Sequence, residues 1–242
     1  MGECTMRLDK LLANMGFGSR KDVKSLLKKK QVFVNGVVAK DGSKHVNPEM
    51  DKVVVDGKQV VYKKYIYLMM NKPPGVISAT VDQKEKTVID LLTKEHQLFE
   101  PFPVGRLDKD TEGLLLITND GELGHRLTSP KKEVGKTYYA KIQGIVTKSD
   151  VEAFKKGIVI DDGYQCKPAR LDILQSNEVS EIEITITEGK FHQVKRMFEA
   201  VGKKVVYLKR LQMGKLKLDE MLALGTYREL NEEELTYCQK LN

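Results

Sequence analysis

The chain has 242 residues and a mass of 27.4 kDa, which is long for one compact domain and sufficient for two. Hydrophobic residues make up 40% of it, so the chain can form cores, and no run of 18 apolar residues is present to span a membrane. Three widely spaced cysteines without a Cys-x-x-Cys pair exclude a disulfide framework and a thiolate zinc site. The N-terminus has no apolar signal stretch, so we expect a cytoplasmic protein.

The net charge of +7 is concentrated at one end of the chain. Residues 6–63 contain 13 Lys and Arg against 6 Asp and Glu, whereas residues 64–242 contain 28 against 27. A small basic domain joined to a larger, nearly neutral one predicts an anionic partner for the first and chemistry for the second. We place the two predicted domains at residues 6–63 and 65–242.

The first predicted elements are two helices and a hairpin. An apolar stripe at i, i+3, i+4 and i+7 predicts an amphipathic helix over residues 8–15. Ser19 follows a glycine-rich break and predicts the N-cap of a second helix, with Asp22 in its first turn. Asn35-Gly36 between two valine-rich runs predicts a type I′ hairpin. Short strands are expected from there to about residue 63.

Basic residues line the second predicted helix. Arg20, Lys24 and Lys28 recur every four residues and therefore share one side of it, with Lys21 beside them. Such a run is often only a solvated helix face. The concentration of the whole charge excess in this domain favours contact with phosphates, which Lys and Arg neutralise without reading the base sequence.

The same residues resemble a known RNA-binding domain. RLDKLL at residues 7–12, followed by SRKDVKSLLKKKQVFVNG at residues 19–36, is similar to the S4 domain. The resemblance covers about residues 6–63. It implies that the helix pair and hairpin hold structured RNA, and that the basic residues of the second helix are RNA contacts.

The larger domain is predicted to mix strands and helices without a regular βαβ repeat. Strands are predicted over residues 65–70, 114–117, 137–142, 181–187 and 204–208, and helices over residues 87–96, 121–127, 148–155 and 191–201. No glycine-rich nucleotide-binding loop is present. We therefore predict an α+β fold with a mixed, largely antiparallel sheet flanked by helices, and not a Rossmann fold.

One motif of this domain places a carboxylate beside a buried strand. In GRLDKDTEGLLLIT, at residues 105–118, Asp108 lies between a glycine-bounded turn and an apolar run. Taken alone, an Asp in this position is often only a turn cap bonded to its own loop. A catalytic role is the alternative interpretation.

Two further motifs carry polar residues in structured surroundings. GKTYY at residues 135–139 places Tyr138 in a strand, where tyrosines commonly pack in a core. EGKFHQVKRMF at residues 188–198 predicts a helix with an apolar stripe. Three polar residues fall off that stripe: His192, Lys195 and Arg196. On their own they would make an ordinary basic helix face.

In this order, behind an S4-like domain, the three motifs resemble the RsuA-type pseudouridine synthases over nearly the whole chain from Met6. Such enzymes detach uracil from its ribose, turn it and rejoin it through carbon. The resemblance therefore implies an isomerase without cofactor or metal. The sequence HQVKRM favours similarity to the enzymes that act on 16S, small-subunit rRNA, because those acting on large-subunit rRNA tend to differ at these positions.

The resemblance also implies roles for individual residues. Asp108 matches the catalytic carboxylate, which acts as nucleophile or as stabiliser of the cleaved sugar, and Asp110 is its only nearby rival. Lys195 matches the basic residue that pairs with that carboxylate. Tyr138 matches a tyrosine that stacks on the target base and acts in proton transfer.

Three more residues are implied as RNA contacts. Arg106 matches an arginine that holds the flipped-out nucleotide, and His192 and Arg196 lie near the catalytic motif. Extruding a uridine from its stack costs a few kcal/mol, which these contacts and the basic domain would offset.

The sequence thus predicts a monomeric, cytoplasmic enzyme that isomerises one uridine of 16S rRNA, free or within an assembling ribosomal particle. One alternative is a synthase for 23S, large-subunit rRNA. Another is a non-catalytic rRNA-binding or ribosome-assembly protein, which would be expected to lose Asp108. A DNA-binding protein with a hydrolase domain is disfavoured, because the sequence offers no hydrolytic triad and no set of metal ligands.

Overall fold

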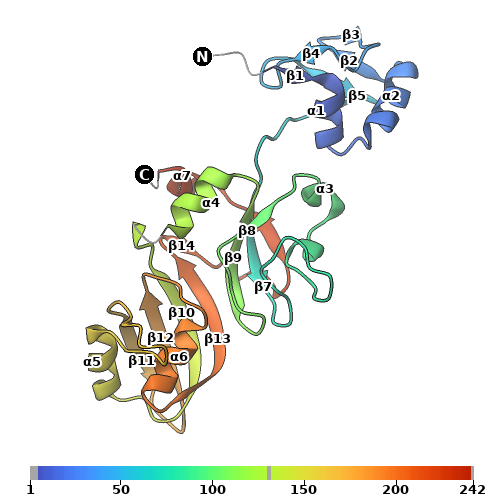
Figure 1. Cartoon of the computed structure of the whole chain (residues 1–242). Helices are drawn as coiled ribbons and strands as arrows, with labels where there is room; N and C mark the ends of the chain where they lie inside the picture. Colours follow the sequence, from blue (N-terminus) through green and yellow to red (C-terminus); the bar gives the residue numbers. More distant parts are fainter. Residues whose placement is uncertain (1–4, 130–131, 241–242) are drawn as a thin grey trace. The chain divides into compact units, whose positions relative to one another are not determined.

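The chain folds into two structural units, each described here by itself (Figure 1). The structure is a computed structural model that describes residues 5–129 and 132–240. The first unit comprises the residues up to Ile66 together with Thr93–Glu100, and the second comprises Tyr67–Leu92 and the residues from Pro101 onward. The last two residues of the predicted domain 65–242 lie outside the described part. No described helix is long and apolar enough to cross a membrane.

The first unit contains the two predicted helices and small sheets. Its elements are β1 (Met6–Arg7), α1 (Leu8–Asn14), α2 (Arg20–Lys28), β2 (Val32–Val34), β3 (Val37–Val38), β4 (His45–Val46), β5 (Val53–Val55), β6 (Lys58–Gln59) and α3 (Lys94–Gln97). Strands β3, β2, β5 and β6 form one antiparallel sheet, and β1 pairs with β4.

Local sequence signals explain how these elements begin and end. The Ser19 hydroxyl accepts a hydrogen bond from the backbone N–H of Asp22, whose carboxylate accepts one from the N–H of Ser19. This capping box starts α2 at the predicted residue. Asn35 and Gly36 have φ angles of 51° and 79°, so the predicted type I′ turn joins β2 to β3. Both predictions are confirmed.

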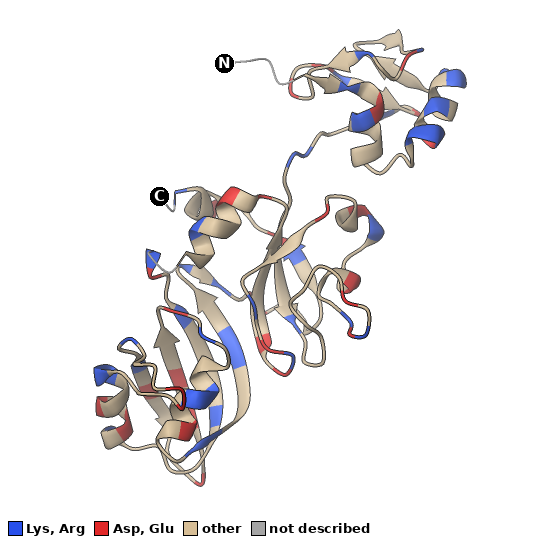
Figure 2. Cartoon of the chain, viewed as in Figure 1, with Lys and Arg blue, Asp and Glu red and all other residues tan. Residues whose placement is uncertain are grey.

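Helix α2 separates an apolar face from a basic one. Val23 and Leu27 are buried in a core that also contains the apolar residues of α1 and of the β2–β5 pair. Its basic residues Arg20, Lys21, Lys24 and Lys28 are all exposed, and Figure 2 shows them as blue bands along the helix. The cations of α2 are thus accessible on the surface of this unit.

The second unit is built on one large sheet. Its elements are β7 (Tyr67–Lys72), a 3-10 turn (Ile89–Leu91), β8 (Phe102–Val104), β9 (Glu112–Thr118), α4 (Gly121–Thr128), β10 (Lys136–Gln143), α5 (Lys148–Lys156), β11 (Arg170–Gln175), β12 (Val179–Ile186), α6 (Gln193–Ala200), β13 (Lys204–Met213), β14 (Leu216–Lys217), β15 (Tyr227–Glu229) and α7 (Glu232–Gln239).

The sheet order is β11-β12-β10-β13-β9-β7-β15, with β8 added beside β9 and β14 beside β13. Among the described strand pairs of this sheet, that of β13 with β9 is parallel and the others are antiparallel. Helix α6 packs on β13 and α5 on β11, as Figure 1 shows. The predicted α+β fold with a mixed, largely antiparallel sheet is confirmed.

One predicted helix is wrong. Residues 87–96 do not form a continuous helix but a 3-10 turn at Ile89–Leu91 and the short helix α3. The Asp90 carboxylate accepts hydrogen bonds from the backbone and hydroxyl of Thr87, which caps the turn. Leu92 is extended, with ψ of 153°, and Thr93 then starts α3 as a new N-cap. Two caps six positions apart, at Thr87 and Thr93, divide what the apolar pattern predicts as one helix.

Candidate active site

Asp108 lies in the loop that joins β8 to β9. The two strands pair antiparallel, so residues 105–111 reverse the chain direction between them. The Ser78 hydroxyl donates to the carbonyl of Leu107 and accepts from its N–H, both at 3.0 Å, and the backbone N–H of Thr111 donates to the Asp108 carbonyl at 3.1 Å. These hydrogen bonds hold the backbone from which the Asp108 side chain extends. Its side chain is 27% exposed, which leaves it accessible.

A buried lysine holds this loop by hydrogen bonds to its backbone. The Lys72 ammonium, at the end of β7, donates to the carbonyls of Pro73 at 2.9 Å, Thr111 at 2.9 Å and Lys109 at 3.3 Å. Burial lowers the pKa of Lys72 to about 8, although the nearby carboxylates of Asp110 and Asp108 oppose that shift. Lys72 therefore holds the loop by donating to backbone carbonyls.

Helix α6 brings two polar residues to Asp108. Lys195 Nζ lies 3.4 Å from Asp108 Oδ2, and His192 Nε2 lies 3.7 Å from Asp108 Oδ1. Val194, Met197 and Phe198 are buried, which turns Lys195 out of the core, as the predicted apolar stripe requires. The structure thus places two separate motifs of the sequence side by side.

The start of α6 is fixed by a buried carboxylate. Glu188 accepts hydrogen bonds from Gln193 Nε2 at 2.7 Å, the Tyr164 hydroxyl at 2.7 Å and the Lys167 N–H at 2.9 Å. Burial alone would raise the pKa of Glu188, but these hydrogen bonds hold it below its ordinary value. His192 precedes the helix in the left-handed region, with φ of 50°. The network sets the position from which Lys195 reaches Asp108.

Asp110 shares the same lysine. Lys195 donates to its two carboxylate oxygens at 2.7 and 2.9 Å, which is closer than its approach to Asp108. Burial alone would raise the pKa of Asp110, but the hydrogen bonds and charge of Lys195 hold it below the ordinary value. The Asp110 side chain is 71% exposed, so of the two carboxylates Asp108 is the more enclosed.

Tyr138 is placed by strand register. In the sheet, Tyr138 of β10 pairs with Arg210 of β13, which in turn pairs with Gly113 of β9, so the three lie in one row. A Cβ on Gly113 would collide with the Arg210 carbonyl oxygen, which explains the glycine at this close approach. Tyr138 is 7% exposed. Gly113, the β9 member of this row, lies near the start of the strand and therefore close in the chain to the Asp108 loop.

Arg210 is a buried cation that the sequence motifs did not indicate. It is 2% exposed, and its Nε donates to the carbonyl of Leu114 at 2.8 Å. Its Nη2 has no hydrogen-bond partner among the described residues. Lys72 was missed in the same way. Lys72 is the one charged residue of β7 and stands at its end, whereas Arg210 follows Lys209 in β13, so neither shows in the sequence as an isolated buried charge.

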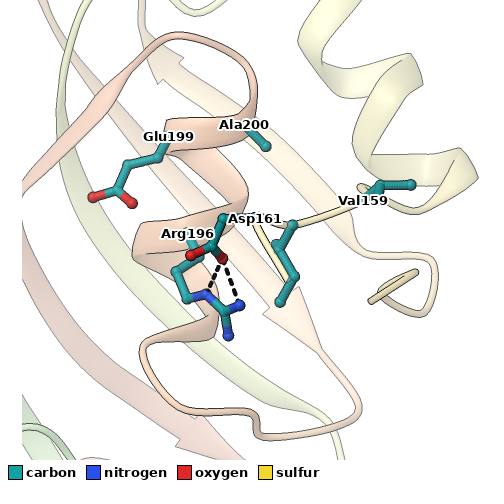
Figure 3. A pocket seen from close by; sticks show the side chains of 6 residues that line it. Val159, Asp161, Arg196, Glu199 and Ala200 are labelled. Atoms are coloured by element: carbon teal, nitrogen blue, oxygen red, sulfur yellow. Dashed lines mark hydrogen bonds and ion pairs between the residues drawn. The ribbon is translucent and has the colours of Figure 1, made fainter. Parts of the chain in front are cut away.

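The remaining predicted RNA contacts are in different surroundings. Arg106 is exposed on the Asp108 loop. The Arg196 guanidinium instead pairs with Asp161 at 2.5 Å (Figure 3). It also pairs with Asp162 at 2.7 Å. It lines a cavity of about 320 Å³ whose lining does not include Asp108, Tyr138 or Lys195. The basic residues of α2 belong to the first unit.

Two family models match the chain. The model described as RNA pseudouridylate synthase matches residues 66–200, and the S4 domain model matches residues 6–53. A crystal structure of a pseudouridylate synthase is similar over 98% of this chain and 100% of its own, with a TM-score of 0.68 and 34% sequence identity.

Relatives match over almost their whole length. An uncharacterized RNA pseudouridine synthase of Bacillus subtilis, YtzG, is 56% identical over 95% of this chain and 97% of its own. Ribosomal small subunit pseudouridine synthase A of Vibrio cholerae is 41% identical over 97% of this chain and all of its own. Ribosomal large subunit pseudouridine synthase B of Bacillus subtilis is 40% identical over 97% of this chain and 96% of its own. The resemblance seen in the motifs thus extends over both units, and the chain belongs to the RNA pseudouridylate synthase family, with an S4 domain in its N-terminal part.

Proposed function

We propose that this enzyme converts one uridine of small-subunit ribosomal RNA to pseudouridine. The observation that carries the proposal is the enclosed carboxylate of Asp108, with Lys195 and His192 on its two oxygens. The similarity to ribosomal pseudouridine synthases supports ribosomal RNA as the substrate. We further propose that residues 6–63 bind the RNA, that residues 65–242 carry out the reaction, and that the enzyme acts as a cytoplasmic monomer.

The proposed reaction rearranges bonds without adding atoms. The bond between N1 of uracil and C1′ of ribose breaks, and a bond between C5 and C1′ forms. The proton leaves C5, and N1 gains one. Asp108 acts at the sugar, either by bonding to it or by stabilising its positive charge after cleavage. The uridine must be extruded from its helix or loop before it can reach the carboxylate.

The other residues of the site then have supporting roles. Lys195 places a positive charge 3.4 Å from Asp108 Oδ2 and orients the carboxylate. Tyr138 stacks on the uracil and takes part in proton transfer. It lies in the row of paired residues that begins in β9 next to the Asp108 loop, which is compatible with that role. Arg106 and His192 contact the RNA around the extruded nucleotide. Arg196 remains a proposed RNA contact, although two carboxylates already pair with it.

The choice of ribosomal subunit rests on a short sequence. Identity does not separate the two classes, because the small-subunit and large-subunit relatives are 41% and 40% identical to this chain. The sequence HQVKRM at residues 192–197 favours the small-subunit class. A single experiment decides between them.

The test uses purified enzyme and separate transcripts of 16S and 23S rRNA, followed by mapping of pseudouridine as carbodiimide adducts. We expect one modified position in 16S rRNA and none in 23S rRNA. Modification of 23S rRNA alone would show that the enzyme belongs to the large-subunit class. If neither transcript is modified, the same mapping on isolated ribosomal particles decides whether the substrate is the assembling subunit, and lack of modification there would overturn the proposal.

A further inference from the structure

Phe191 is an exposed aromatic side chain next to the candidate active site. It is 72% exposed and precedes His192, whose Nε2 lies 3.7 Å from Asp108 Oδ1. Single exposed apolar side chains are common on proteins, so exposure alone assigns no role. The arrangement of this ring is more specific.

The phenyl ring of Phe191 is stacked on the imidazole of His192. The ring centroids are 3.8 Å apart, and the planes differ by 18°. One face of the phenyl ring is therefore covered by the imidazole, and the exposure of the side chain leaves its other face open. The two rings form a stack that starts beside Asp108 and ends in an accessible aromatic face.

The backbone that carries the two rings is held on both sides. The Lys190 N–H donates to Gln193 Oε1 at 2.8 Å, and Gln193 is itself buried against Glu188. The carbonyl of Phe191 accepts from Arg196 Nη1 at 3.4 Å, and that of His192 from the Arg196 N–H at 3.0 Å. The left-handed conformation of His192 is therefore supported by the surrounding structure, and the stack is positioned before any ligand arrives.

The segments that carry the stack and Asp108 also present cations to an RNA. Lys190 and Arg106 are exposed, and Lys195 lies one turn along α6 on the same side as Asp108. Unpaired bases of RNA stack on exposed aromatic side chains with little dependence on base identity. Extruding one uridine also leaves its neighbour without a stacking partner on one side.

From this geometry we propose that the Phe191–His192 stack is a platform for the base that adjoins the target uridine. The inference rests on the proposed function and adds a substrate contact to it. The open face of Phe191 takes the place of the extruded uracil in the base stack. The platform binds the neighbouring nucleotide and takes no part in bond breaking, so its loss should weaken substrate binding and leave the chemical step nearly unchanged.

The chain contains no tryptophan, so Phe191→Trp creates a single fluorescent reporter at the platform. Titration with 16S and 23S rRNA transcripts should quench its fluorescence, because the indole stacks on a base. The matched control is Leu174→Trp, on the edge strand β11, where the side chain is 56% exposed. Its fluorescence should not change on RNA addition.

Steady-state kinetics give the second measurement. Phe191→Ala should raise KM about tenfold, as expected for the loss of one base–aromatic stack, with kcat within about twofold of wild type. Phe191→Tyr, which keeps the ring, should restore KM. Thermal unfolding of each variant checks that the fold is intact, which we expect because the side chain is largely exposed.

Two results would overturn the platform: an unchanged KM for Phe191→Ala, or an unquenched tryptophan at position 191 under conditions where wild type is saturated with RNA. A loss confined to kcat would also overturn it. Wild-type enzyme is assayed in parallel. If wild type forms pseudouridine while the variants behave as wild type, only the platform fails. If wild type forms none on any ribosomal substrate, the proposed function fails and the platform with it.

Discussion

Lys195 Nζ lies 3.4 Å from Asp108 Oδ2, which joins the first turn of α6 to the loop before β9. The same ammonium group donates shorter hydrogen bonds, of 2.7 and 2.9 Å, to Asp110. One lysine thus serves two carboxylates, and their exposed fractions distinguish them: 27% for Asp108 and 71% for Asp110. The more enclosed carboxylate can be surrounded more completely by an extruded nucleoside, so we propose Asp108 as the catalytic carboxylate.

Replacement of Asp108 by Asn is expected to abolish isomerisation and to preserve RNA binding, because the substitution keeps the shape and removes the charge. Pseudouridine is measured by carbodiimide mapping, and binding by filter retention. Asp110→Asn is the control and should retain most activity. If the two variants exchange behaviour, Asp110 is the catalytic carboxylate.

Loss of the Lys195 charge should impair catalysis through Asp108. We expect Lys195→Met to lower kcat/KM by about 100-fold, the effect of removing one well-placed electrostatic contact from an active site. Lys195→Arg should recover part of the activity, since the charge remains but the planar group is placed differently. The decisive comparison repeats Lys195→Met in an Asp110→Asn background. A loss that disappears there would show that Lys195 acts through Asp110.

The basic face of α2 should contribute to RNA affinity by neutralising phosphates. Replacing Arg20, Lys21, Lys24 and Lys28 by Gln should weaken binding and reduce the slope of log Kd against log salt by about 3, at roughly 0.7 to 0.9 for each phosphate that is no longer neutralised. Lys148, Lys155 and Lys156, exposed on α5, are the control set. An unchanged slope in the α2 variant would mean that its cations are only a solvated surface.

The ion pairs of Arg196 should hold the segment that contains Asp161 and Asp162 against α6. Arg196→Gln is therefore expected to increase hydrogen exchange of the amides over residues 158–165, while Lys195→Met leaves them protected. RNA binding is measured alongside. A fall in the salt slope of about 1 would show that Arg196 contacts a phosphate, as the sequence predicts.

Burial of Lys72 should make stability depend on pH. Its pKa is about 8 in the folded protein, against about 10.4 for a lysine in an unfolded chain. Between these values the unfolded state binds more protons, so stability rises with pH as the desolvation cost of the charged form disappears. Urea unfolding should show wild type gaining up to about 3 kcal/mol relative to Lys72→Met between about pH 8 and 10. If the difference in unfolding free energy between wild type and Lys72→Met stays constant over this pH range, the lowered pKa of Lys72 is contradicted.

The sequence by itself determined the features that depend on neighbouring residues. Ser19 and Asp22 cap α2, and Asn35-Gly36 turns the hairpin, because both signals act within four residues. The apolar stripe of α6 likewise indicated which side chains leave the core. The same local reasoning failed for residues 87–96, where two caps compete with an apolar pattern.

Only the tertiary structure decided which charged groups meet. Lys195 is divided between two carboxylates, Lys72 donates to three carbonyls beneath their loop, and Arg196 pairs with Asp161 and Asp162. Apart from the carbonyl of Pro73, these partners come from segments far apart in the chain, and neither spacing nor composition specifies which of several aspartates a given cation reaches. Sheet register and helix packing fix those distances, because they orient each backbone segment before the side chains can pair.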